Sequence, residues 1–105
     1  MKKALPVMQN SSGAYALHQY LQDELLNKKS LGALIWLLDC GRELEFSYNG
    51  SLGFISCSET KKAISLWLDK KEYAFDSVSS LLEAKCFADK CLLEIWDAIE
   101  IETLF

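Results

Sequence analysis

The chain contains little of what catalytic sites are usually built from. Its 105 residues include one proline, one histidine (His18), and five glycines that form neither a Gly-x-Gly-x-x-Gly nor a Walker pattern for holding phosphate. General-base and nucleophilic mechanisms need a histidine or a poised carboxylate beside a nucleophile, and no partner motif accompanies His18. We interpret His18 as a structural or partly exposed imidazole. We expect no enzymatic activity, no catalytic residue and no cofactor.

Metal-ligand spacing is also missing. The chain has four cysteines: Cys40, Cys57, Cys86 and Cys91. The closest pair is Cys-x4-Cys and the histidine lies far upstream, so no metal site is expected. An even cysteine count would suggest disulfides in a secreted protein, but Pro6 interrupts the apolar stretch after Met1-Lys2-Lys3, which gives no adequate signal sequence. We expect a cytoplasmic protein with free thiols.

Long apolar runs and basic stripes are absent as well. The longest apolar run, Ala33–Leu38, is far below the roughly 20 residues of a membrane-spanning helix. The formal net charge is -4, with about +1 in residues 1–41 and about -5 in residues 42–105. Binding to nucleic acid needs clustered Lys and Arg, so we expect neither nucleic acid nor a membrane as a partner. A basic protein partner fits this charge better.

The segment Arg42–Cys57 has the clearest structural pattern. Over residues 43–48 the sequence reads ELEFSY, so apolar and polar side chains alternate as in a half-buried strand. Asn49-Gly50 follows, and both residues tolerate the positive φ of a type I′ turn. Apolar residues resume at Leu52 and Phe54. The segment therefore predicts a β-hairpin.

Two helices are expected before this hairpin. After a lead-in over residues 1–11, with N-cap chemistry in residues 10–13, the 3.6-residue period of apolar side chains predicts a helix over Gly13–Lys29. Ser30 can cap a second helix over Leu31–Cys40. Residues 31–38 also fit a buried strand, although the length of this run and its few β-branched residues favour a helix.

The hairpin is expected to continue into a sheet. Ala63–Leu68 and Glu72–Phe75 alternate as two further strands, with Trp67 facing away from the apolar side of its strand, and together they suggest an antiparallel meander. Asp76 and Ser77 can cap a helix that ends near residues 86–87.

A shorter helix and a last strand complete the predicted fold. We expect Asp89 to cap a helix over Lys90–Asp97, which would bury Leu92, Leu93 and Trp96. Alternation over Ala98–Leu104 predicts a strand that returns to the sheet. The prediction is one α+β domain over residues 1–105: two N-terminal helices, an antiparallel sheet of about four to five strands, and two short helices before a C-terminal strand.

Acidic residues are the one surface feature with functional content. The candidate partner-binding residues are Glu43, Glu45, Glu94, Asp97, Glu100 and Glu102. If the last strand lies near the hairpin, they merge into one acidic patch. Such a patch can be a solvated face that keeps a small domain soluble. It can also be a docking surface that steers a basic partner.

Three segments resemble small bacterial proteins encoded with polymorphic toxins, among them the immunity proteins of contact-dependent growth inhibition systems. The segments are Gly41–Gly50 (GRELEFSYNG), Phe75–Val78 (FDSV) and Lys90–Asp97 (KCLLEIWD). The similarity covers residues 41–105 in pieces. It implies a non-enzymatic inhibitor that binds one cognate toxin domain in the cytoplasm of the producing cell and covers its active site or substrate surface. Such toxins are often nucleases and often basic, so an acidic inhibitor can mimic the charge of nucleic acid.

Two other function classes stay open. An adaptor or regulatory module would bind through an exposed apolar patch, for which Trp36 and Trp67 are candidates because both lie off the apolar faces of their segments. Core packing or a subunit interface would explain the same tryptophans. A small-molecule binding or enzymatic role ranks third, because no constellation of site residues supports it.

Overall fold

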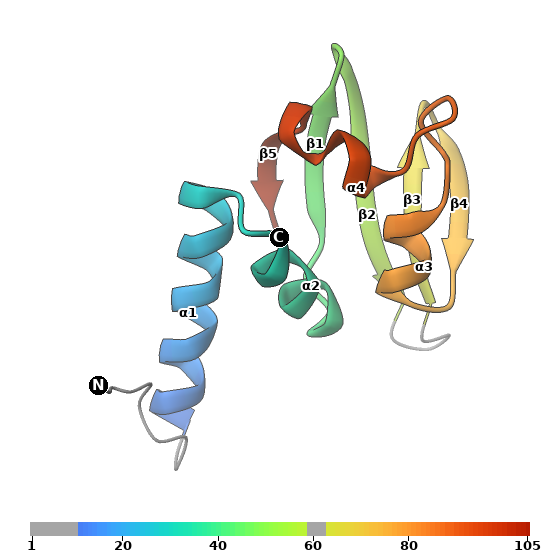
Figure 1. Cartoon of the computed structure of the whole chain (residues 1–105). Helices are drawn as coiled ribbons and strands as arrows, with labels where there is room; N and C mark the ends of the chain where they lie inside the picture. Colours follow the sequence, from blue (N-terminus) through green and yellow to red (C-terminus); the bar gives the residue numbers. More distant parts are fainter. Residues whose placement is uncertain (1–10, 59–62) are drawn as a thin grey trace. The chain divides into compact units, whose positions relative to one another are not determined.

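The computed structural model describes residues 11–58 and 63–105, and most of the expected lead-in lies outside them. The described chain is α+β, as predicted, with two N-terminal helices, a five-stranded antiparallel sheet, and short helices before the last strand (Figure 1). It divides into two compact units, one up to Leu37 and one over Leu38–Phe105. No helix in these residues is long and apolar enough to cross a membrane.

The first unit contains helix α1 (Ser11–Lys28) and most of helix α2 (Leu31–Asp39). The Ser30 hydroxyl accepts a hydrogen bond from the Ala33 backbone N–H at 3.2 Å, which confirms Ser30 as the N-cap of α2. Residues 31–38, which also fitted a buried strand, are therefore helical. Lys29 lies outside α1, because its φ of 52° takes the chain out of helical geometry. The His18 ring stands edge-on to the Trp36 ring at 5.4 Å, an aromatic contact between the two helices.

The second unit is built on an antiparallel sheet with the strand order β4-β3-β2-β1-β5. Its strands are β1 (Leu44–Tyr48), β2 (Ser51–Ser58), β3 (Ala63–Leu68), β4 (Lys71–Phe75) and β5 (Glu100–Leu104). The predicted hairpin is confirmed: β1 pairs with β2, and Asn49 and Gly50 have φ values of 52° and 82°. The predicted return of the last strand is confirmed too, since β5 pairs with β1.

One face of the sheet is covered by helices α3 (Val78–Glu83) and α4 (Leu92–Ile95), which lie on the same side in Figure 1. The buried side chains of the sheet are Leu44, Phe46, Ile55, Ile64 and Leu66, and those of the helical segments are Val78, Leu81, Leu82, Leu92, Ile95, Trp96 and Ile99. Sheet and helices therefore share one apolar core.

Gly53 is required by this core. It pairs with Phe46 across the β1–β2 ladder, and a Cβ built at Gly53 would lie 2.6 Å from Cε2 of the Phe46 ring. The ring therefore lies directly over the backbone of β2, and it is 1% exposed. A strand glycine often marks such a close approach.

The segment between α3 and α4 differs from the prediction. α3 begins after the predicted Ser77 cap but ends at Glu83, because Ala84 adopts an extended backbone. Asp89 is not a helix cap, because it lies in a two-residue turn between Phe87 and Lys90. The backbone N–H of each of these two residues donates a hydrogen bond to the carbonyl of the other.

The second short helix is also shorter than predicted. Cys91 stands at the N-cap of α4, and the helix tightens after Ile95 into the 3-10 turn η1 (Trp96–Ala98), so Ala98 is not part of the last strand. Leu92 and Trp96 are buried as predicted, but Leu93 is 40% exposed. Ile95 takes its place in the core because the helix presents positions 92, 95 and 96 inward.

The turn between α3 and α4 predicts a stabilising substitution. Ala88 has a φ of 51°, a left-handed conformation that costs an L-residue about 1 kcal/mol. Ala88→Gly is expected to raise the free energy of unfolding by about 0.5 kcal/mol after allowance for the more flexible unfolded chain. Urea denaturation measures it, with Ala74→Gly in β4, where the backbone is extended, as a control expected to lose stability. A loss of stability in Ala88→Gly would contradict the prediction.

Candidate functional site

The sheet face that points away from α3 and α4 carries an ordered row of side chains. Trp67 pairs with Phe54 and Glu72, and Phe54 pairs with Glu45, so the four residues cross four neighbouring strands side by side. We call this sheet face the outer face, and we call Glu45, Phe54, Trp67 and Glu72 the acid–aromatic row. Two aromatic rings form its centre and a carboxylate stands at each end.

Apolar groups of the outer face reach solvent. Trp67 is 36% exposed and Phe105, whose ring packs edge-on against Phe54 at 5.8 Å, is 57% exposed. Leu52 is 60% exposed. The Trp67 Nε1–H donates to the Ser56 hydroxyl at 3.0 Å, which holds the indole in one orientation. Large exposed aromatic groups with polar neighbours are typical of protein interaction sites.

Hydroxyl groups hold the carboxylates of this face in place. The Ser65 hydroxyl donates to Glu72 at 2.6 Å, the Ser47 hydroxyl donates to Glu102 at 2.8 Å, and the Thr103 hydroxyl donates to Glu45 at 3.3 Å. A carboxylate accepts up to about four hydrogen bonds, so each has capacity for a further partner. The only basic residue within the five described strands is Lys71, which lines a cavity on the opposite side of the sheet.

The structure brings together three of the six acidic residues predicted to bind a partner. Glu45, Glu100 and Glu102 lie on β1 and β5, where Glu100 pairs with Ser47. Glu43 is half-buried just before β1, and its carboxylate accepts a hydrogen bond from the Cys57 backbone N–H at 2.9 Å. Asp97 is exposed in η1.

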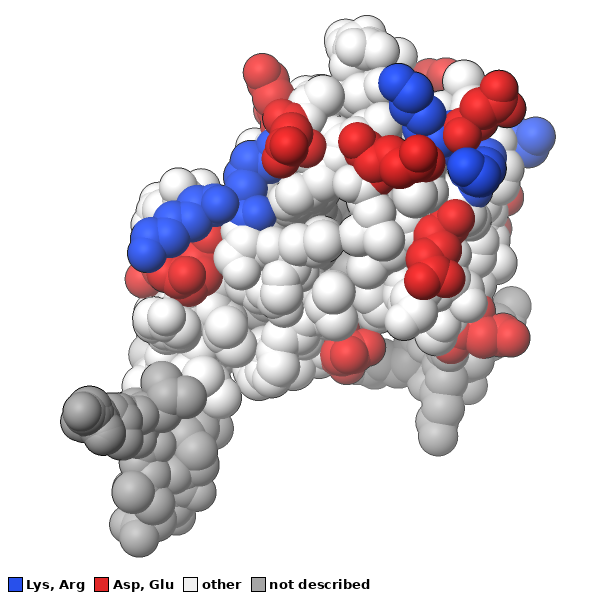
Figure 2. Space-filling view, in the orientation of Figure 1, with Lys and Arg blue, Asp and Glu red and all other residues white. Residues whose placement is uncertain are grey.

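Glu94 is engaged within its own helix. Its carboxylate accepts a hydrogen bond from the Cys91 backbone N–H at 2.9 Å and lies 3.8 Å from the Lys85 ammonium. On this side of the second unit, acidic and basic side chains lie next to one another (Figure 2). Within the described strands the only basic residue is Lys71, on the opposite face, and Arg42 donates a hydrogen bond to the Phe105 carbonyl next to the outer face. The outer face is therefore the stronger candidate for binding a basic partner.

Glu94 gives a prediction about pH. The Cys91 backbone N–H lowers the pKa of this carboxyl, and Lys85 lowers it further. A lowered pKa in the folded state stabilises the fold above the ordinary pKa of a glutamate, and the contribution is lost as pH falls through the folded value. The gap in urea midpoint between the wild type and Glu94→Gln should therefore be larger at about pH 7 than at about pH 3. Glu83→Gln is the control, and an equal gap at both pH values would contradict the assignment.

No protein-family model, curated protein or solved structure matches this chain. Function is therefore inferred from the geometry of the surface.

Three of the four thiols are not activated as nucleophiles. Burial raises the pKa of the Cys40, Cys57 and Cys86 thiols, so these groups are protonated at neutral pH. In residues 11–58 and 63–105, no three His, Cys, Asp or Glu side chains gather in a way that could hold a metal ion.

Half of the acid–aromatic row was missed from the sequence. Phe54 is surrounded by other apolar residues in LGFIS, where period-2 alternation is obscured because Gly53 occupies an inward position. Glu72 precedes Tyr73 in a short strand, and a single acidic residue there has no distinctive pattern. A register derived from the Asn49-Gly50 turn could have placed Phe54 opposite Glu45.

Proposed function

We propose that this protein is an immunity protein that binds and neutralises a cognate bacterial toxin domain, and that this toxin domain is a basic nuclease. The observation that supports this proposal is the acid–aromatic row, in which Glu45 and Glu72 flank the paired rings of Phe54 and Trp67. We place the toxin contact on the outer face, which would cover the toxin's active site or its substrate surface. The cytoplasm of the producing cell is the proposed site of action.

The chemistry of the row suits an arginine-rich or lysine-rich partner. A guanidinium group can stack on the indole of Trp67, with a cation–π interaction worth about 0.5–2 kcal/mol depending on desolvation. The same guanidinium can pair with the carboxylate of Glu72, the neighbour of Trp67 in the row. Tryptophan with a polar rim is also the usual composition of an interface hot spot.

The charge distribution supports fast capture of such a partner. Residues 42–105 carry about -5 of formal charge, and Glu100 and Glu102 extend the acidic rim of the outer face along β5. Opposite charges on two proteins raise the association rate by long-range attraction, which salt weakens. An inhibitor that protects its own cell benefits from association faster than the toxin's encounter with substrate.

An adaptor role is the alternative, and the exposed apolar side chains favour it. Leu52 and Phe105 stand in solvent beside the row, at 60% and 57% exposure, and could bind a neutral partner through apolar contact alone. The two functions differ in their dependence on salt. A toxin inhibitor steered by charge loses association rate at high ionic strength, whereas an apolar adaptor changes little.

Growth rescue tests the proposal. The protein is co-expressed with the toxin domain encoded beside it in its source genome, and cell growth is measured after toxin induction. We expect the wild type to restore growth and Glu45→Gln/Trp67→Ala/Glu72→Gln to fail.

The control for charge is Glu83→Gln/Asp89→Asn, which also removes two negative charges, but from exposed positions outside the sheet. We expect this control to restore growth fully, with both variants present at wild-type levels in the soluble fraction. No rescue by the wild type would refute the immunity function, and rescue by the row variant would refute the contact surface.

A further inference from the structure

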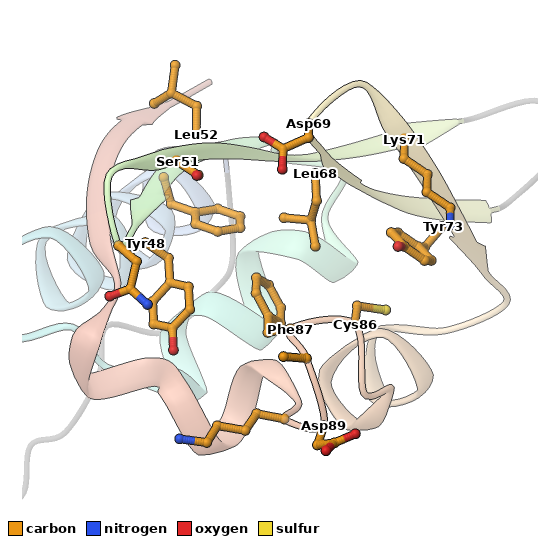
Figure 3. Close-up of a pocket in the computed structure, with 14 residues that line it drawn as sticks. Tyr48, Ser51, Leu52, Leu68, Asp69, Lys71, Tyr73, Cys86, Phe87 and Asp89 are labelled. Atoms are coloured by element: carbon orange, nitrogen blue, oxygen red, sulfur yellow. The ribbon is translucent and has the colours of Figure 1, made fainter.

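A cavity lies on the α3/α4 side of the sheet, within the second unit and on the opposite side from the acid–aromatic row. Three turns enclose it: the β1–β2 turn, the β3–β4 turn and the turn between α3 and α4 (Figure 3). Its volume is about 730 Å³, within the usual range for small-molecule sites. The three turns contribute Asn49, Asp69 and Ala88, which are non-glycine residues with left-handed backbones.

Aromatic rings form the floor of this cavity. The Phe87 ring stands edge-on to Tyr48 at 5.7 Å and lies 6.4 Å from the ring of Phe46. Tyr73 adds a fourth ring on the β4 wall, where Figure 3 shows it near Lys71. Rings at these separations prefer edge-to-face and offset contacts, and one further ring can join them in the same way. The floor is therefore suited to a flat aromatic group.

Two pairs of opposite charges line the cavity, Asp69 and Lys71 at the β3–β4 turn and Asp89 and Lys90 at the turn between α3 and α4. Lys71 extends its ammonium over the Tyr73 ring, 5.2 Å from the ring centroid, and both residues line the cavity. Asp69 comes from the start of the same β3–β4 turn, and Figure 3 shows its carboxylate above Leu68. Lys70, which lies between them, does not line the cavity.

We propose that this cavity binds a free aromatic α-amino acid. Its ring lies on the floor at Tyr48 and Phe87 and faces Tyr73 on the β4 wall, its carboxylate pairs with Lys71 and its ammonium pairs with Asp69. The positive and negative side chains of the β3–β4 turn, which both line the cavity, complement the two charges of an amino-acid zwitterion. A ligand with only one of these charges would use only one of the two side chains. This site is on the opposite side of the sheet from the acid–aromatic row, so the inference does not depend on the proposed function.

Titration with three related probes tests the site. L-phenylalanine carries both charges, phenethylamine only the ammonium and 3-phenylpropionate only the carboxylate. Binding to the full-length protein is followed by chemical-shift changes in its amide NMR spectrum. We expect L-phenylalanine to bind at least about tenfold more tightly than either singly charged probe, since one charge-assisted hydrogen bond accounts for a factor of that size.

Substitutions that keep the turn assign each charge. Asp69→Asn retains a residue that accepts a left-handed backbone, and Lys71→Gln retains most of the alkyl stem. Each substitution should weaken the binding of L-phenylalanine about tenfold. Asp69→Asn should leave the affinity for 3-phenylpropionate unchanged, and Lys71→Gln should leave the affinity for phenethylamine unchanged. Lys70→Gln is the matched control and should bind as the wild type does.

Three results would overturn the proposal. They are no saturable shift with L-phenylalanine up to about 10 mM, equal affinity for all three probes, or the same loss of affinity in Lys70→Gln as in Lys71→Gln.

Discussion

Phe46→Ala is expected to lower the free energy of unfolding by about 3–5 kcal/mol, the usual cost of removing a buried phenylalanine. The Phe46 ring is 1% exposed and lies between β2 and Phe87, so its removal leaves a void that neither neighbour fills. Urea denaturation with a fixed m-value measures the change. Phe54→Ala is the matched control on the outer face, and its half-buried ring should cost clearly less.

The contact between Phe46 and Gly53 can be isolated with a double-mutant cycle. Gly53→Ala alone is expected to cost about 1–3 kcal/mol, because the added methyl group overlaps the Phe46 ring. In the Phe46→Ala background, the cost of Gly53→Ala should be smaller by at least about 1 kcal/mol. Additive costs would show that the ring does not lie over Gly53.

Neutralising the carboxylates of the outer face is expected to slow association with a basic partner by at least about tenfold at low ionic strength. The variant is Glu45→Gln/Glu72→Gln/Glu102→Gln. Each glutamine can still accept a hydrogen bond from the hydroxyl that holds the carboxylate, so the fold is retained.

Stopped-flow association with the purified toxin domain, at several salt concentrations, measures this effect. The wild-type rate should fall steeply with salt and the variant rate should be nearly flat. Asp76→Asn/Glu83→Gln/Asp89→Asn removes three charges outside the strands and should retain most of the wild-type rate. If this control slows association as much as the outer-face variant does, the net charge of the protein, and not the outer face, would determine the association rate.

Local patterns predicted most of the fold. The alternation ELEFSY and the Asn49-Gly50 turn fixed the β1–β2 register, because a two-residue turn with both φ values positive leaves one pairing. Ser30 and Ser77 marked helix starts, since each side chain accepts a backbone N–H three residues on.

Helix ends after Ser77 were harder to predict because backbone pairing overrode side-chain propensity. Asp89 is a good cap by type, but the hydrogen bonds between Phe87 and Lys90 place it in a turn. The Glu94 carboxylate accepts a hydrogen bond from the Cys91 backbone N–H, and α4 begins at Leu92, two residues after the predicted start at Lys90. Neither interaction follows from spacing of apolar residues.

The acidic rim of the site was predicted more fully than its aromatic centre. Glu45, Glu100 and Glu102 follow from alternation in β1 and β5, and Trp67 was recognised as facing away from the core of β3. The neighbours of Trp67 depend on the register of the β2–β3 and β3–β4 pairs, which no local turn motif specified. A row that crosses four strands is a property of the assembled sheet.

Carboxyl footprinting of the complex with the toxin domain shows directly whether the outer face forms the contact. A carbodiimide couples an amine label to exposed carboxylates, and mass spectrometry compares labelling in the free protein and in the complex. If the toxin binds the outer face, Glu72 and Glu102 are strongly protected and labelling of Glu83 and Asp89 is unchanged. Unchanged labelling of Glu72 and Glu102, with protection at Glu83 and Asp89, would contradict binding at the outer face and place the contact outside the sheet.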